Sequence, residues 1–175
     1  MNYTLATLSE LQRFADIAPS GIPHKVVCDV KLEGFDLPKG TSVLANLHAC
    51  HRDPEHWTHP DQFYPEHFLD EQGEYIKDKE GFVPYGTGET LVDHRKCPLT
   101  KRFHVPGMRK CPADELAQME TFLILTNLLQ AFSFRTPSGD NGKIGTYYKA
   151  GTSVLRNPKP FYVVLQNRKS GLFFE

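Results

Sequence analysis

The sequence of 175 residues is short of cysteine, of surplus charge and of long apolar runs, and each shortage excludes a class of protein. Four cysteines are too few for a disulfide scaffold, so we expect a reducing compartment. Lysine plus arginine number 20 and aspartate plus glutamate 21, which argues against a nucleic-acid binder or a polybasic membrane-surface protein. The longest apolar run, residues 122–132, is shorter than a membrane span, and the N-terminus lacks a signal-peptide pattern. We therefore expect no nucleic-acid partner and no membrane anchor in this chain.

The spacing of apolar residues, prolines and glycines predicts an α+β fold, mainly α, with small antiparallel sheets. Leucines at three-residue spacing predict a helix over 5–14, and a dense apolar stretch predicts a buried helix over 113–132. Loose alternation over 25–50 predicts a small sheet, in which we expect Cys28 and Cys50 to be packed thiols. The remaining ranges are a meander over 51–81, a loop over 82–112, and strands and loop over 133–175.

Two groups of polar residues are ambiguous when judged by spacing alone. Glu10 and Arg13 share one helix face, where an exposed ion pair of small worth is the simplest interpretation. Five histidines between His48 and His67 invite a metal site, but the prolines among them break any helix that would align them. Hydrogen-bonded histidines in an ordered meander are the favoured interpretation.

The tetrapeptide RKCP occurs twice, and only one copy stands in a setting that activates a thiol. Cys111 directly precedes the second predicted helix, whose N–H groups and dipole favour a thiolate, and Arg109 adds positive charge. Such a thiolate attacks electrophiles or binds a soft metal centre such as haem iron. No periodic helix follows Cys97, so the same argument fails there.

Five segments, taken in order, resemble the C-terminal part of a cytochrome P450, a haem-thiolate monooxygenase, and are most similar to the animal microsomal family-2-like branch. The first is an ExxR helix at Glu10-Leu11-Gln12-Arg13, followed by FDLPKGT at 35–41. The others are the aromatic-Pro-Glu meander at 63–68, the opening of the haem-binding loop at 82–86, and Cys111 before its apolar helix. The resemblance implies the C-terminal part of the cytochrome P450 fold over residues 1–175.

The haem-binding loop, 82–112, departs from the family pattern in one place. Removing residues 90–108, an insert of 19, joins Tyr85-Gly86-Thr87-Gly88-Glu89 to Arg109-Lys110-Cys111 and restores the pattern. Cys97 fits less well, because Leu99 stands where the family needs a small residue. The resemblance therefore assigns the ligand cysteine to Cys111.

By resemblance, Cys111 is the axial ligand of the iron of haem b, and Arg109 and His24 are partners of the haem propionates. Glu10 and Arg13 are expected in a buried structural network with the meander near His67, where many members carry arginine. This expectation overturns the surface-pair interpretation of Glu10 and Arg13.

The resemblance also implies an activity and its partners. The family inserts one oxygen atom of O2 into a small apolar substrate, such as a steroid, fatty acid or xenobiotic, with electrons from an NADPH-dependent reductase at the cytoplasmic face of the endoplasmic reticulum. Family members are more than twice this length, so we expect the isolated chain neither to fold stably nor to turn over substrate. Two alternatives stay open: a truncated or mis-spliced product without chemistry, and a zinc module built from His94, Cys97, His104 and Cys111, whose spacing matches no common zinc framework.

Overall fold

A computed structural model of the chain describes residues 1–86, 111–137 and 155–168. The chain divides into two units, Met1–Asp114 and Glu115–Glu175. In the described ranges the elements are helices and three antiparallel two-stranded sheets, so the predicted α+β class is confirmed. The two units are described one at a time below.

The first unit begins with α1 (Asn2–Ala15), which starts three residues earlier than predicted. Its buried face carries Ala6, Glu10 and Arg13, while Leu5 and Leu11 of the leucine pattern are exposed. The residue that follows the helix and caps its C-terminus is Asp16, which has a left-handed backbone with φ 46° and donates its N–H to Gln12 O. The face that the helix buries is therefore largely polar.

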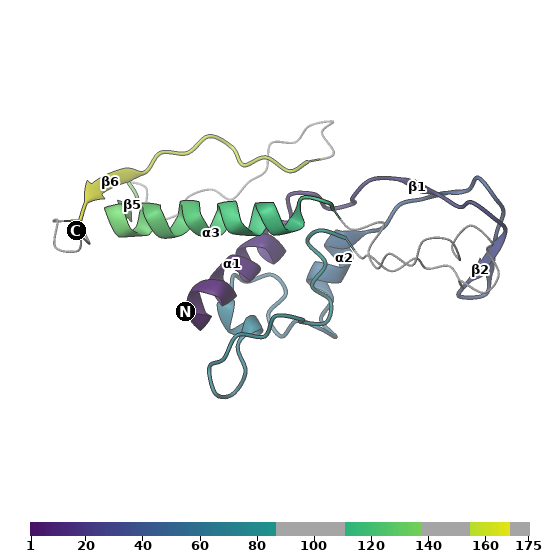
Figure 1. Ribbon diagram of the computed structural model, residues 1–175, viewed down its shortest axis with the longest axis horizontal. Helices are drawn as coiled ribbons and strands as arrows, with labels where there is room; N and C mark the ends of the chain where they lie inside the picture. Colours follow the sequence, from purple (N-terminus) through teal and green to yellow (C-terminus); the bar gives the residue numbers. More distant parts are fainter. Residues whose placement is uncertain (87–110, 138–154, 169–175) are drawn as a thin grey trace. The chain divides into compact units, whose positions relative to one another are not determined.

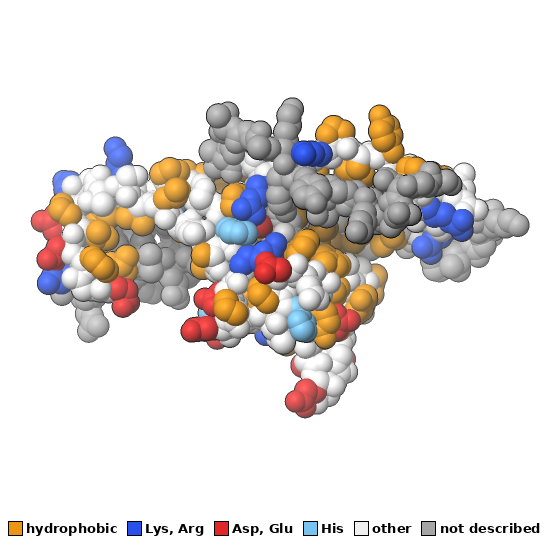
Figure 2. Space-filling model, turned by 180° about the vertical axis from the view of Figure 1, so that it is seen from behind, with side chains coloured by type: hydrophobic (Ala, Val, Ile, Leu, Met, Phe, Trp, Pro, Cys, Tyr) orange, Lys and Arg blue, Asp and Glu red, His pale blue; other side chains and the backbone are white. Residues whose placement is uncertain are grey.

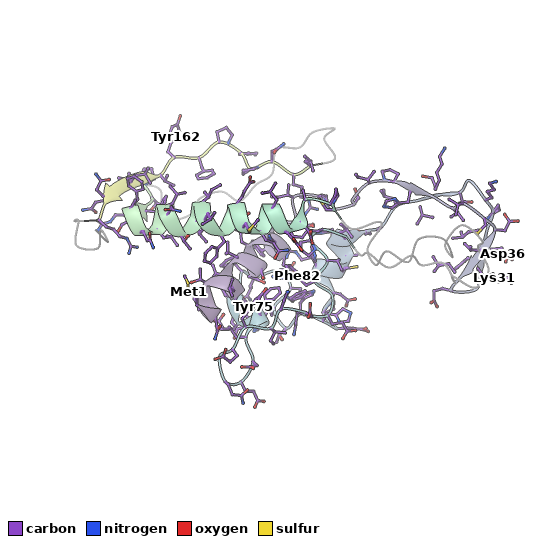
Figure 3. All side chains as sticks on the ribbon, in the orientation of Figure 1. Met1, Lys31, Asp36, Tyr75, Phe82 and Tyr162 are labelled. Atoms are coloured by element: carbon purple, nitrogen blue, oxygen red, sulfur yellow. The ribbon has the colours of Figure 1, made fainter. Side chains whose placement is uncertain are left out.

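Two small sheets follow α1 where one sheet was predicted over 25–50. In the second, Glu33 and Gly34 both have positive φ, which gives the tight turn that two-residue hairpins favour. Lys31 and Asp36 pair across this exposed hairpin (Figure 3). The paired strands are β1 (His24–Lys25) with β4 (Ser42–Val43), and β2 (Val30–Leu32) with β3 (Phe35–Leu37).

The predicted sheet was wrong at its C-terminal end, because residues from Leu47 onward form the short helix α2 (Leu47–Arg52). The Asn46 side chain accepts the Ala49 N–H and caps this helix, which a strand would not need. Both cysteine predictions also need correction. Cys28 lies half-buried between strands, and Cys50 lies exposed on α2.

The core of the first unit lies where the meander packs on α1. The short 3-10 helix η1 (Pro65–Phe68) lies against α1 (Figure 1). Ala6, Trp57 and Phe68 are buried there, and Tyr75 and Phe82 pack against them (Figure 3). The loop of residues 70–74 projects from this core, with acidic side chains at its tip (Figure 2). The meander is thus ordered by a small aromatic core.

The second unit contains α3 (Asp114–Ala131) and the pair β5 (Phe132–Arg135) and β6 (Val164–Asn167). None of the described side chains of α3 is buried, so the prediction of a buried helix was wrong. Leucines and other apolar residues occur all round α3, and two four-residue strands are too small to cover them. In the ranges that the structure describes, no helix combines the length and apolar character that a membrane crossing requires.

Candidate haem-binding segment and its supporting network

The Glu10–Arg13 pair lies on the inner face of α1 and is fully buried. Arg13 Nε donates to Glu10 Oε2 at 2.8 Å, and Arg13 Nη2 donates to Glu10 Oε1 at 2.7 Å. Both side chains are 0% exposed, so the surface-pair interpretation was wrong. Spacing along a helix identifies a shared face, and the contacts of the rest of the chain decide whether that face meets water.

Arg13 also binds the backbone of the segment that follows α2. Its Nη1 donates to the carbonyls of His51 at 2.7 Å and Pro60 at 2.8 Å, and its Nη2 donates to Gln62 O at 2.8 Å. These bonds and the two to Glu10 occupy the guanidinium's five N–H groups. The ring of Trp57 lies 5.0 Å from the guanidinium carbon. Arg13 therefore fixes the path of the meander against α1.

His67 completes this network from η1. Its Nε2 accepts the His59 N–H at 3.1 Å, and its Nδ1 lies 3.3 Å from Glu10 Oε2. Since a backbone N–H only donates, the ring proton lies on Nδ1 and is donated to Glu10. Burial lowers the pKa of His67 despite the neighbouring carboxylate. A neutral imidazole leaves Glu10 and Arg13 as one balanced ion pair.

A second buried carboxylate, Asp16, contacts two histidines of α2. Its Oδ2 lies 2.7 Å from His48 Nδ1, and its Oδ1 lies 3.3 Å from His51 Nδ1. His51 is buried, and its Nε2 accepts the Val83 N–H at 3.1 Å. Sequence reasoning missed this cluster. An aspartate at the end of a helix and a histidine-rich segment were the available signals, and neither shows that the two meet.

Cys111 is placed by its backbone. Its N–H donates to Tyr85 O at 3.0 Å, and its carbonyl accepts the N–H of Asp114, the first residue of α3, at 3.3 Å. The Tyr85 hydroxyl accepts a bond from Gln12 Nε2 at 2.6 Å, which ties this residue to α1. Burial raises the pKa of Tyr85, so the phenol stays protonated and neutral at physiological pH. Residues 85 and 111 are thereby joined, although the chain between them is long.

The other predicted site residues lie elsewhere. His24 is half-buried on β1 opposite Val43, and no hydrogen bond between described residues joins it to Cys111. Arg109 and the zinc candidates His94, Cys97 and His104 lie outside the described residues. In the described part of the chain, no three His, Cys, Asp or Glu side chains are arranged to hold a metal ion.

The chemistry of Cys111 fits ligation of haem iron by one thiolate. The residue is exposed and forms no disulfide, so its sulfur is accessible to a planar group. It stands just ahead of the 18-residue helix α3. A single soft sulfur ligand is what haem-thiolate proteins use, whereas a structural zinc site needs four ligands.

Comparison with known proteins identifies the family. The sequence profile of the family described as Cytochrome P450 matches residues 1–97 and 106–165. Vitamin D(3) 25-hydroxylase of Sus scrofa is 43% identical over 139 residues, which are 79% of this chain and 24% of that protein. Cytochrome P450 2U1 of Bos taurus is 39% identical over 168 residues, 96% of this chain and 26% of that protein. Cytochrome P450 2L1 of Panulirus argus is 35% identical over 167 residues, 95% of this chain and 30% of that protein. The chain thus spans roughly a quarter of the length of these relatives, and it belongs to the cytochrome P450 family.

Proposed function

We propose that this chain is the haem- and iron-binding segment of a monooxygenase that inserts one oxygen atom of O2 into an apolar organic substrate. Membership of the cytochrome P450 family supports the reaction class. The observation that carries the proposal is the placement of Cys111, whose N–H is bound by Tyr85 O while the Tyr85 hydroxyl is bound by α1. A steroid, a fatty acid or a xenobiotic is the class of substrate we propose.

In this proposal each residue has a stated task. Cys111 would supply a thiolate ligand to the iron of haem b, and Arg109 and His24 would pair with its propionates. Haem b, when bound, supplies the iron that activates dioxygen. Glu10, Arg13 and His67 hold the meander on α1, and so support the segment that ends at Tyr85. Preorganisation of this kind matters because ligand geometry tolerates little displacement.

The cysteine assignment requires that residues 90–108 be accommodated as an insert. The Tyr85–Cys111 hydrogen bond closes a loop over 86–110, and removing 90–108 would shorten that loop about fourfold. Chain-entropy scaling gives a closure cost for the longer loop of only about 1.3 kcal/mol. The family profile leaves out residues 98–105, which fall inside the proposed insert. The small closure cost supports an insert that leaves the hydrogen bond between Tyr85 and Cys111 in place.

We further propose that catalysis needs more protein than these residues and an NADPH-dependent reductase, at the cytoplasmic face of the endoplasmic reticulum. The chain spans roughly a quarter of the length of its relatives, and α3 exposes apolar side chains such as Leu123 and Ile124. Those side chains fit a helix that packs against further protein. The isolated chain is expected to show no turnover.

The test is the absorbance spectrum of the chain expressed with haem, reduced and exposed to carbon monoxide. A red-shifted thiolate-type Soret band that Cys111→Ala removes and Cys97→Ala preserves is the expected result. The reverse pattern would refute the assignment of Cys111. A variant lacking residues 90–108 should bind haem at least as well, and loss of the band in that variant would contradict the insert. Stoichiometric zinc without haem uptake would overturn the whole proposal.

A further inference from the structure

The His51 side chain connects the end of α1 to the segment that leads to the cysteine. Its Nδ1 lies 3.3 Å from Asp16 Oδ1, and its Nε2 lies 3.1 Å from the backbone nitrogen of Val83. The ring is 1% exposed, so water does not compete for either contact. Its carbonyl is held separately by Arg13 at 2.7 Å. Both the side chain and the backbone of His51 are therefore fixed.

The protonation of the ring follows from its partners. The Val83 N–H only donates, so His51 Nε2 must accept and carries no proton. The proton then lies on Nδ1, where Asp16 accepts it. Each ring nitrogen thus has a distinct partner.

The turn that begins at Val83 places the carbonyl that binds Cys111. Gly86 N–H donates to Val83 O at 3.1 Å, which closes a turn over 83–86. Tyr85 lies within this turn, with its hydroxyl bound by Gln12 and its carbonyl bound by the Cys111 N–H. One end of the turn is therefore fixed through His51, and the other through α1.

We propose that His51 is a positioning residue for the cysteine segment. By holding the Val83 N–H from Asp16, its imidazole orients the turn so that Tyr85 O meets the Cys111 N–H. The proposal deepens the proposed function and rests on it for the consequence at the haem ligand. His51 contacts neither the thiol nor a substrate by any described hydrogen bond, so its effect passes through the backbone.

Two substitutions separate the tasks of the two ring nitrogens. In His51→Asn the amide NH2 takes the place of Nδ1 and can reach Asp16, but the side chain is too short for Val83. In His51→Gln the amide oxygen takes the place of Nε2 and can accept the Val83 N–H. His48→Asn is the matched control, because His48 binds the same carboxylate at 2.7 Å and makes no described bond to the turn.

The measurement is amide hydrogen exchange of the haem-free full chain, resolved to the Val83 and Cys111 amides. The reference amides are His67 and Ile76, which are bonded within the meander. With His51→Asn we expect Val83 and Cys111 to exchange about two- to tenfold faster relative to the reference, the effect of one lost hydrogen bond. His51→Gln should exchange more slowly than His51→Asn there, and His48→Asn should match the wild type.

Any one of four results would overturn the proposal. The first three are an unchanged ratio in His51→Asn, an equal effect of His48→Asn, and no recovery in His51→Gln. Acceleration spread evenly over all four amides also refutes it, since that marks a merely structural role. If His51→Asn does not fold, Asp16→Asn replaces it, because asparagine tolerates the left-handed backbone and weakens the same contact. Asp16→Asn should then accelerate Val83 and Cys111 selectively, and equal exchange at all four amides would count against the proposal.

The haem spectrum keeps the two claims apart. A wild-type chain without a thiolate-type band refutes the proposed function, while the exchange ratios are measured without haem and still decide the role of His51. If the wild type shows the band, His51→Asn should lower the thiolate-type share of the spectrum, whereas His48→Asn should leave it unchanged.

Discussion

Arg13→Lys tests the buried network most directly, because it keeps the charge and removes the geometry. Arginine makes five hydrogen bonds here, two to Glu10 and three to backbone carbonyls. A lysine ammonium has three donors and no planar fork, so at least two of the five contacts are lost. Each buried polar group left unpaired costs about 1–3 kcal/mol, which gives a loss of about 2–6 kcal/mol. Whole domains are stable by only about 5–15 kcal/mol.

Trp57 provides the assay for this variant. It is the one tryptophan of the chain, it is 1% exposed, and its indole N–H donates to Cys50 O at 2.8 Å. Its emission therefore reports whether the meander is packed on α1. In a urea titration of the full chain we expect the Arg13→Lys midpoint to fall far below that of the wild type, or no folded baseline to remain.

Arg52→Lys is the control for the same substitution on a neighbouring arginine. Arg52 donates to Pro60 O and Phe14 O, its side chain is 18% exposed, and its carboxylate partner Asp61, at 3.8 Å, is 90% exposed. An exposed ion pair contributes little and lysine keeps its charge, so we expect Arg52→Lys to cost less than Arg13→Lys. The reasoning fails if Arg13→Lys costs no more than Arg52→Lys, or if its emission and midpoint match the wild type.

Three further predictions use other described features. Burial lowers the pKa of His67, so as pH falls the unfolded chain protonates this imidazole before the folded chain does. The free energy of unfolding should therefore fall as pH drops below 6.5 and through the folded pKa. His67→Gln should lack this pH dependence, and an identical slope in the variant would show that His67 is not its source. Gly81→Ala should lower the melting temperature more than Gly73→Ala does. Both glycines have φ near +80°, where a side chain costs about 1–2 kcal/mol, but only a Cβ at 81 meets a histidine side chain, at 3.0 Å. Equal losses of stability would contradict this. Haem should protect Cys111 and not Cys50 from a thiol reagent, since both are exposed without it; equal protection would argue against ligation by Cys111.

The two long helices were predictable from sequence because their signals are local. The leucine spacing identified the helix at 5–14. Within this pattern Leu8 is buried, whereas Leu5 and Leu11 are exposed and the charged Glu10 is buried. Hydrophobic periodicity assumes that the buried face is apolar, and a fully satisfied ion pair breaks that assumption.

The site depended on contacts between segments far apart in sequence. The resemblance over short motifs predicted that Glu10, Arg13 and His67 form one network, and in the structure Glu10 contacts both of the others. Nothing local indicates that Asp16 meets His51 or that Tyr85 meets Cys111. Such pairs can be identified only when the partner of each buried donor and acceptor is known, and that requires a three-dimensional structure. In the described ranges no buried side-chain nitrogen or oxygen is left without a partner.

Two constraints act on the residue at position 16, one from the backbone and one from the side chain's partners. A helix end with a left-handed backbone selects glycine, for which φ 46° carries no steric penalty. The neighbouring imidazoles select a carboxylate, which glycine cannot supply. Aspartate is among the few residues that tolerate the backbone and provide the charge. Few alternatives are open to mutation at this position, because any replacement that relaxes the backbone removes the acceptor on which two segments depend.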